Sequence, residues 1–186
     1  MILPTALAAG LVLAGASAAV AAHAQDNPLV AQRQASMKAM AEAARTIDWM
    51  FKGRRDYDAR AFKEATETIR RHSGQALVSE YPSGSFGGES GATAEIDSSR
   101  EEFVALAEHI ERFAAELSRA ADEAPEEITE DMRMAHGTVM GGGSLLGRRP
   151  TRDAAVDPAT IPAEHVFHLM LQDCASCHAK FREKVE

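Results

Sequence analysis

The chain has 186 residues and a formal net charge of −8; hydrophobic residues make up 45% of it and aromatic residues 5%. This length suits one domain, or one domain with an added segment. The acidic balance argues against nucleic acid or an anionic membrane surface as the main partner, because both would repel the chain. Alanine is abundant and runs of β-branched residues are few, which favours helices over strands.

Residues 1–24 have the features of a cleaved secretory signal peptide. The segment has no Lys, Arg, Asp or Glu, contains an apolar stretch and ends in the small-residue pattern Ala22-His23-Ala24. A basic start is missing, and an uncleaved membrane anchor is the alternative, but an Ala/Gly-rich segment with His23 near its end makes a poor membrane span. We therefore expect export, a mature chain of residues 25–186, a periplasmic location and no stable membrane insertion after cleavage.

Four segments carry apolar residues at the spacings of three and four that predict amphipathic helices. They run from about 28 to 52, 58 to 78, 98 to 121 and 162 to 184. No strand pairs are evident, and residues 79–96 are rich in Gly and Ser and indicate a long loop. Four helices of this length predict an all-α fold, an antiparallel four-helix bundle whose core can hold a cofactor.

The helical spacing also predicts which side chains face the core. The expected inward residues are Val30, Met37, Met40, Ala44, Ile47 and Phe51 in the first segment, Phe62, Ala65, Ile69 and Ala76 in the second, Phe103, Leu106, Ile110, Phe113 and Leu117 in the third, and Phe167, Met170, Cys174, His178 and Phe181 in the fourth.

An inserted segment, residues 122–161, separates the third predicted helix from the fourth. Its first half could form an additional short helix that starts at Pro125, with acidic residues in the first turn. Copper binding is one hypothesis for its cluster of sulfur and imidazole side chains, and packing of the methionines on the bundle is the favoured interpretation. The residues concerned are Met132, Met134, His136 and Met140.

Residues 174–178, CASCH, form the Cys-x-x-Cys-His haem attachment signature. On a helix, Cys174, Cys177 and His178 share one face, so two thioethers and an iron ligand fit into little more than one turn. A structural zinc site usually needs four Cys or His ligands, and a Cys-x-x-Cys disulfide closes too small a loop to stabilise much. The motif predicts one covalent haem c, attached at Cys174 and Cys177, with His178 as iron ligand.

A lone motif of this kind at the end of a four-helix bundle resembles the class II c-type cytochromes, the cytochrome c′ family. Phe181-Arg182 is similar to the aromatic-Arg ending of that family, RQASMKAM at 33–40 resembles its first-helix motif, and YPSGS at 81–85 resembles the loop between its second and third helices. The resemblance covers about 25–121 and 162–186. The chain departs from the family at 122–161, where members usually have a short turn.

The resemblance implies the remaining contacts of the haem. It places Met37 opposite the iron as a sixth ligand, which is the pattern of the low-spin, Met-ligated subgroup, and it pairs Arg33 with a haem propionate. From spacing alone, Met37 and Met40 are equal candidates, because methionine is also a gap-filling core residue. For Arg33, the alternative is a solvated surface charge.

Together these features predict a periplasmic monohaem c-type cytochrome that carries one electron and is not an enzyme. His178 and Met37 would be the axial ligands, and unidentified redox proteins would dock weakly. The alternative is a five-coordinate haem protein that binds NO or CO, which requires that Met37 does not ligate or is easily displaced. The resemblance also implies a possible homodimer, since family members often pair through their first two helices.

Overall fold

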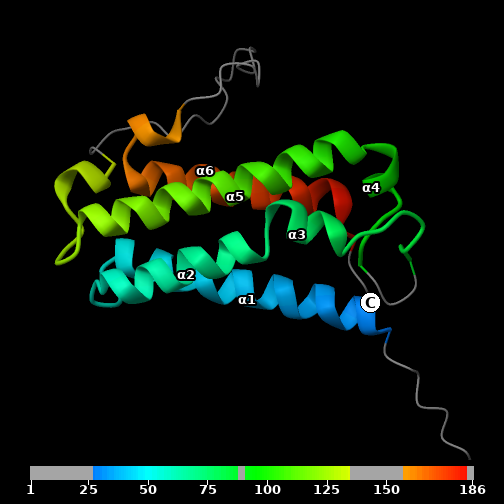
Figure 1. The fold of residues 1–186 in the computed structure, drawn as a ribbon, viewed down its shortest axis with the longest axis horizontal. Helices are drawn as coiled ribbons and strands as arrows, with labels where there is room; N and C mark the ends of the chain where they lie inside the picture. Colours follow the sequence, from blue (N-terminus) through cyan, green and yellow to red (C-terminus); the bar gives the residue numbers. More distant parts are fainter. Residues whose placement is uncertain (1–26, 88–90, 135–156, 184–186) are drawn as a thin grey trace, which may run out of the picture.

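The computed structural model describes residues 27–87, 91–134 and 157–183. Four long helices run side by side in alternating directions (Figure 1), which confirms the predicted all-α antiparallel four-helix bundle. They are α1 (Pro28–Phe51), α2 (Ala59–Arg71), α5 (Arg100–Glu123) and α6 (Ala163–Phe181). The connections contain α3 (Gly74–Ser79), α4 (Glu95–Ser98) and the 3-10 turns η1 (Glu130–Met132) and η2 (Pro158–Thr160). Within the bundle, α1 packs on α2, α2 on α5, and α5 on α6.

The first two long helices begin at side-chain caps. The Asn27 side chain accepts a hydrogen bond from the Leu29 backbone N–H at 3.0 Å, and Asp58 accepts one from Ala61 at 2.7 Å. Each cap satisfies a backbone donor that has no partner inside the helix. After α1, Gly53 has a φ of +63°, a left-handed conformation that ends the helix.

The second predicted helix, 58–78, is wrong in one respect, because it is two helices. α2 ends at Arg71, and α3 begins at Gly74, whose φ of +57° lies in the left-handed region. A left-handed residue turns the chain, so the helical periodicity cannot continue across it. As a result Ala76, predicted to face inward, is exposed, while Leu77 and Val78 are buried.

Some inward faces are also rotated from the predicted ones. In α1, Ile47 and Phe51 are buried as predicted, but the polar residues Arg33 and Ser36 are buried as well. The shift has a physical cause, because both polar side chains find partners in the segment that follows α3. The residues predicted inward that are only partly buried are Val30, Met37, Met40, Ala44, Phe113 and Cys174, and His178 is exposed.

The core consists of two hydrophobic clusters, one toward each end of the bundle. The first holds a group of rings in which Phe51 lies 5.5 Å from Phe62 and 5.8 Å from Phe167, centroid to centroid. The second lies at the end where α6 finishes and includes Tyr81, Phe103, Cys177 and Phe181, with Met37 packed against it. We refer to these as the far cluster and the near cluster.

The described part of the inserted segment does not form the predicted helix at Pro125, and its helical turns are η1 and, just before α6, η2. Tertiary contacts hold it extended instead: the Tyr57 hydroxyl donates to the Ala124 carbonyl at 2.8 Å, and the Arg133 guanidinium donates to the Phe51 carbonyl at the end of α1. Met132 is buried in the far cluster, which confirms the packing interpretation for this residue. His136 and Met140 lie outside the described residues.

Replacing Met132 with alanine should lower the free energy of unfolding by about 2–5 kcal/mol, the usual loss for a buried methionine. The residue is 4% exposed and packs in the far cluster, so the truncation leaves a cavity. Guanidinium unfolding of the haem-loaded protein measures the change. Met134→Ala is the matched control: Met134 is only half-buried, so a smaller loss is expected, and equal losses would contradict the packing role of Met132.

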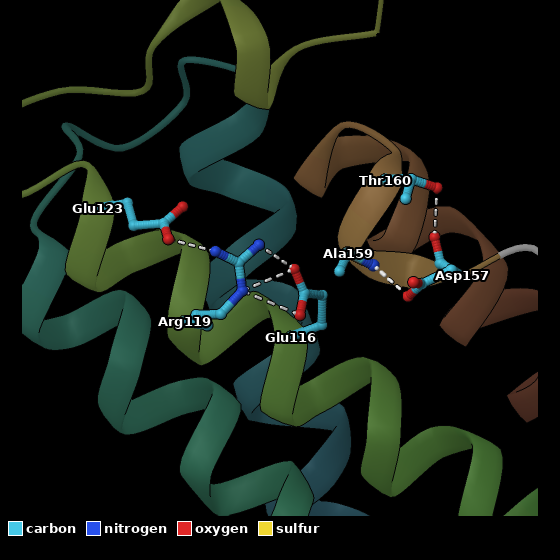
Figure 2. A network of polar contacts seen from close by, with 6 residues as sticks. All are labelled: Glu116, Arg119, Glu123, Asp157, Ala159 and Thr160. Carbon is cyan, nitrogen blue, oxygen red and sulfur yellow. Dashed lines mark hydrogen bonds and ion pairs between the residues drawn. The ribbon is translucent and has the colours of Figure 1, made fainter.

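The last turns of α5 lie beside η2, and both are fixed by polar contacts (Figure 2). The Arg119 guanidinium bridges Glu116 and Glu123 on the surface of α5. Asp157 begins η2 by accepting hydrogen bonds from the Ala159 N–H at 3.1 Å and from the Thr160 hydroxyl at 2.7 Å. Because Arg119 and Glu123 are exposed, these ion pairs contribute little to stability.

Over the described ranges, none of the helices has the length and apolar character needed to cross a membrane. The predicted signal peptide, residues 1–24, lies outside those ranges, so its cleavage and the periplasmic location stay predictions.

Candidate haem site

A groove of about 510 Å³ opens at the near end of the bundle between α1 and α6. The two helices approach each other at the far end, where the Phe51 and Phe167 rings meet. Toward the near end their side chains leave the groove between them. Its lining includes Met37, Tyr81, Phe103, Cys177, His178 and Phe181.

α6 brings the haem motif to one wall of this groove. Cys177 and His178 both line it, and His178 lies in the last turn of the helix. The residue as a whole is exposed, but the surrounding protein, and then the Arg182 charge, lower the pKa of its imidazole below the usual 6.5. At neutral pH the ring is therefore uncharged, which is the form that ligates a metal.

The two cysteines are free thiols in different surroundings. Cys177 is buried at the groove, while Cys174, one turn earlier, packs partly buried against the far cluster. Burial raises the pKa of Cys174 to about 11 and that of Cys177 to about 12. Both thiols are thus neutral near pH 7, unlike the thiolates of a zinc site.

α1 supplies the opposite wall, and here the structure distinguishes the two methionine candidates by position. Met37 lines the groove. Met40, one turn further along α1, packs against both hydrophobic clusters. Met37 is therefore the candidate that lies in the same groove as His178.

Arg33 also lines the groove, but it is not a solvated surface charge, since it is only 3% exposed. Its Nε donates to the Glu80 carbonyl at 2.7 Å, and its terminal nitrogens donate to the carbonyl and hydroxyl of Ser85. The guanidinium also stacks on the Tyr81 ring, 4.3 Å from its centroid. Arg33 thus joins α1 to residues 80–85, and its contact with a haem propionate stays a prediction.

The sequence analysis missed Ser36 and Glu80, which lie behind this wall. The Ser36 hydroxyl donates to a Glu80 carboxylate oxygen at 2.7 Å, and both residues are buried. The local pattern carries no signal for this pair, because the two residues are far apart in the chain and each alone is typical of an exposed helical position.

Residues 91–93 complete the rim by pairing with the chain just after the haem motif. The Thr93 N–H donates to the Phe181 carbonyl at 3.0 Å, and the Glu183 N–H donates to the Gly91 carbonyl at 2.9 Å. Between them, Ala92 and Arg182 form an isolated antiparallel bridge. The pairing holds the end of α6 against residues 91–93.

These residues fit a haem. The groove has the size of a cofactor site, it is lined largely by apolar and aromatic side chains, and it presents an imidazole and a thioether from opposite helices. In the part of the chain that is described, no group of three or more His, Cys, Asp or Glu residues could hold a separate metal ion. When bound, haem would supply the Fe(III)/Fe(II) couple; His178 and Met37 would face its iron, and Cys174 and Cys177 would anchor its edge.

The Cys174→Ser/Cys177→Ser double variant should lose all covalent haem, because neither serine can form the thioether. Each single variant should keep one attachment. Mass spectrometry and haem staining after denaturing electrophoresis measure the attached group. Ser176→Ala, an exposed change between the two cysteines, is the control and should retain the wild-type amount. Covalent haem in the double variant would contradict the assignment.

A family model described as Cytochrome C' matches residues 28–141 of the chain. The chain belongs to the cytochrome c′ family. The match ends before α6, so the Cys-x-x-Cys-His motif at 174–178 is a second and separate indication. Members of this family bind one covalent haem c, and this cytochrome c′ family protein carries the two cysteines that attach it.

Solved structures of cytochromes c′ share this fold. One cytochrome c′ is 21% identical with a TM-score of 0.56, over 84% of this chain and 95% of that one. The nitric oxide complex of a mutant cytochrome c prime from Alcaligenes xylosoxidans is 22% identical with a TM-score of 0.55, over 84% and 94%. A mutant cytochrome c′ from Rhodopseudomonas palustris is 25% identical with a TM-score of 0.50, over 84% and 98%. No curated protein matches the chain.

Proposed function

We propose that this protein is an exported, periplasmic carrier of single electrons whose low-spin haem iron is held between His178 and Met37. The observation that supports it most is the position of Met37, which lines the groove from α1 while Cys177 and His178 line it from α6. Met/His ligation is an established arrangement in cytochromes c, where it raises the reduction potential.

The side chains around the groove suit this task. Tyr81, Phe103 and Phe181 pack into the near cluster and exclude water from one side of the site. Two protein ligands that stay in place in both oxidation states would leave little structure to rearrange when an electron arrives or departs. The proposal requires no general acid, base or nucleophile.

Redox proteins that dock weakly over the groove opening are the proposed partners. Lys38 and Arg182 line the groove, are exposed and are basic, although the chain as a whole is acidic. A partner with an acidic surface around its own redox centre would be complementary to this face.

A homodimer through α1 and α2 is a second proposal, supported by Trp49, which is 41% exposed on α1.

The alternative function is the binding of NO or CO. The similar structure from Alcaligenes xylosoxidans is a nitric oxide complex, and this chain has the same fold. On this alternative, Met37 is either unbound or displaced by the gas, and the groove provides the space for it.

Optical spectra of the purified haem protein in both redox states, with and without CO, separate the two functions. A sulfur-to-iron charge-transfer band in the oxidised protein, and a reduced spectrum that CO changes only slowly, are the expected results for the carrier. A high-spin spectrum that converts at once on addition of CO would overturn the Met37–His178 axial pair and favour the gas-binding function.

A further inference from the structure

The buried carboxylate of Glu80 holds the turn of α1 that leads into Met37. Glu80 is 7% exposed and follows α3 directly. One carboxylate oxygen accepts from the Ser36 hydroxyl at 2.7 Å and, at 3.5 Å, from the Gln32 amide. Its backbone carbonyl accepts from Arg33 Nε at 2.7 Å. All three donors belong to the helical turn immediately before Met37.

The second carboxylate oxygen of Glu80 is buried and has no hydrogen-bond partner among the residues described. A buried charge that is incompletely paired is costly, so its retention calls for an explanation. Arg33 supplies part of it: burial lowers the Arg33 pKa, and the neighbouring Tyr81 and then Glu80 counteract that lowering. Glu80 and Arg33 therefore lie together behind the wall of the groove that carries Met37, joined by the bond from Arg33 Nε to the Glu80 carbonyl.

A series of stacked side chains continues from this pair to the opposite wall. The Arg33 guanidinium lies 4.3 Å from the centroid of Tyr81, the residue after Glu80. Tyr81 and Phe103 lie 5.4 Å apart, and so do Phe103 and Phe181, in edge-on contacts. Phe181 ends α6, one turn after His178. The position of α1 at Met37 is thus coupled through packed groups to the position of α6 at His178.

We propose that Glu80 is a positioning residue, which fixes the Met37 turn of α1 relative to His178 and so sets how readily Met37 leaves the iron. The inference rests on the proposed Met37 ligation and names the group that controls it. Without the Glu80 carboxylate, the turn loses the bonds from Ser36 and Gln32 and keeps those that Arg33 makes to residues 80 and 85. Met37 would then dissociate more easily, and an external ligand would compete better for the same position.

The test compares Glu80→Ala, Glu80→Gln and Ser36→Ala in the haem-loaded protein. Glu80→Ala should weaken the sulfur-to-iron band and raise the CO affinity by about tenfold, within the usual range for coupling between two sites. Glu80→Gln keeps an oxygen that can accept from Ser36 and should restore most of the wild-type band. Ser36→Ala removes only the partner hydroxyl, and it should shift both readouts in the same direction by less.

Glu64→Ala on α2 is the matched control, because Glu64 is an exposed carboxylate paired with Arg60, and it should leave both readouts unchanged. Circular dichroism identifies the variants that fold. If Glu80→Ala does not fold, Ser36→Ala tests the inference in its place. If the folded variants keep the wild-type band and CO affinity, the inference about Glu80 is overturned, while the proposed function still stands. Equal shifts in Glu80→Ala and Glu80→Gln would overturn the hydrogen-bonded anchor. Absence of the band from the wild-type protein would overturn the proposed function, and this inference with it.

Discussion

Replacing Met37 with leucine is expected to abolish the sulfur-to-iron band and to convert the haem iron from six- to five-coordinate. Leucine has nearly the volume of methionine, so the groove stays filled while the thioether is lost. CO affinity should rise by about a hundredfold if the sixth position of the wild-type iron is open about 1% of the time. The reduction potential should fall, because the thioether favours the reduced iron.

Met40→Leu provides the control for this experiment. Met40 lies one turn away on α1 and packs against both clusters, so its replacement should leave the spectrum and the CO affinity as in the wild type. Optical titration with CO and a potentiometric titration measure both variants. An unchanged spectrum in Met37→Leu, together with loss of the band in Met40→Leu, would transfer the ligand assignment to Met40.

Replacing Phe167 with alanine should cost about 3–5 kcal/mol of unfolding free energy, the largest stability loss we expect from a single truncation. Phe167 is 1% exposed and joins α6 to α1 through its contact with Phe51. Because native proteins are stable by only about 5–15 kcal/mol, this change should remove a large fraction of the stability of the bundle. Guanidinium unfolding, monitored by circular dichroism, gives the value.

Trp49→Ala tests whether the loss of unfolding free energy in Phe167→Ala results from the burial of Phe167. Trp49 is on the same helix as Phe51 but is 41% exposed, so its removal should change the stability by about 0.5 kcal/mol or less. A larger loss in Trp49→Ala than in Phe167→Ala would show that the far cluster does not stabilise the bundle as its packing implies.

The four long helices were predictable because each has an uninterrupted apolar pattern and, in two cases, an evident cap. Gly74 was not recognised as a break, since a single glycine is often tolerated inside a helix and only its positive φ shows otherwise. Pro125 with its acidic neighbours is typical of a helix start, but tertiary contacts of Tyr57 and Arg133 hold that segment in another conformation. In this segment the tertiary contacts outweigh the local preference for a helix.

The candidate site, too, was predictable only in part from the sequence. The haem motif is readable because its three residues are adjacent in the sequence, and Met37 was ranked above Met40 only through the resemblance to a family. Burial of Arg33 and the contact of Ser36 with Glu80 could not be predicted, because both depend on a segment more than forty residues along the chain. Such long-range contacts produce no periodic pattern in the sequence around either residue.

The two walls of the groove come from α1 and α6, which are far apart in the sequence, and this separation has a consequence for how the protein folds. α1 packs on α2, α2 on α5 and α5 on α6, whereas the groove needs α1 and α6 together, so it can form only after all three of these pairs are in place. We therefore expect the groove to form in the last and slowest step of folding. Until then the thiols of Cys174 and Cys177 remain open to reaction, so haem attachment and the docking of α6 compete in time.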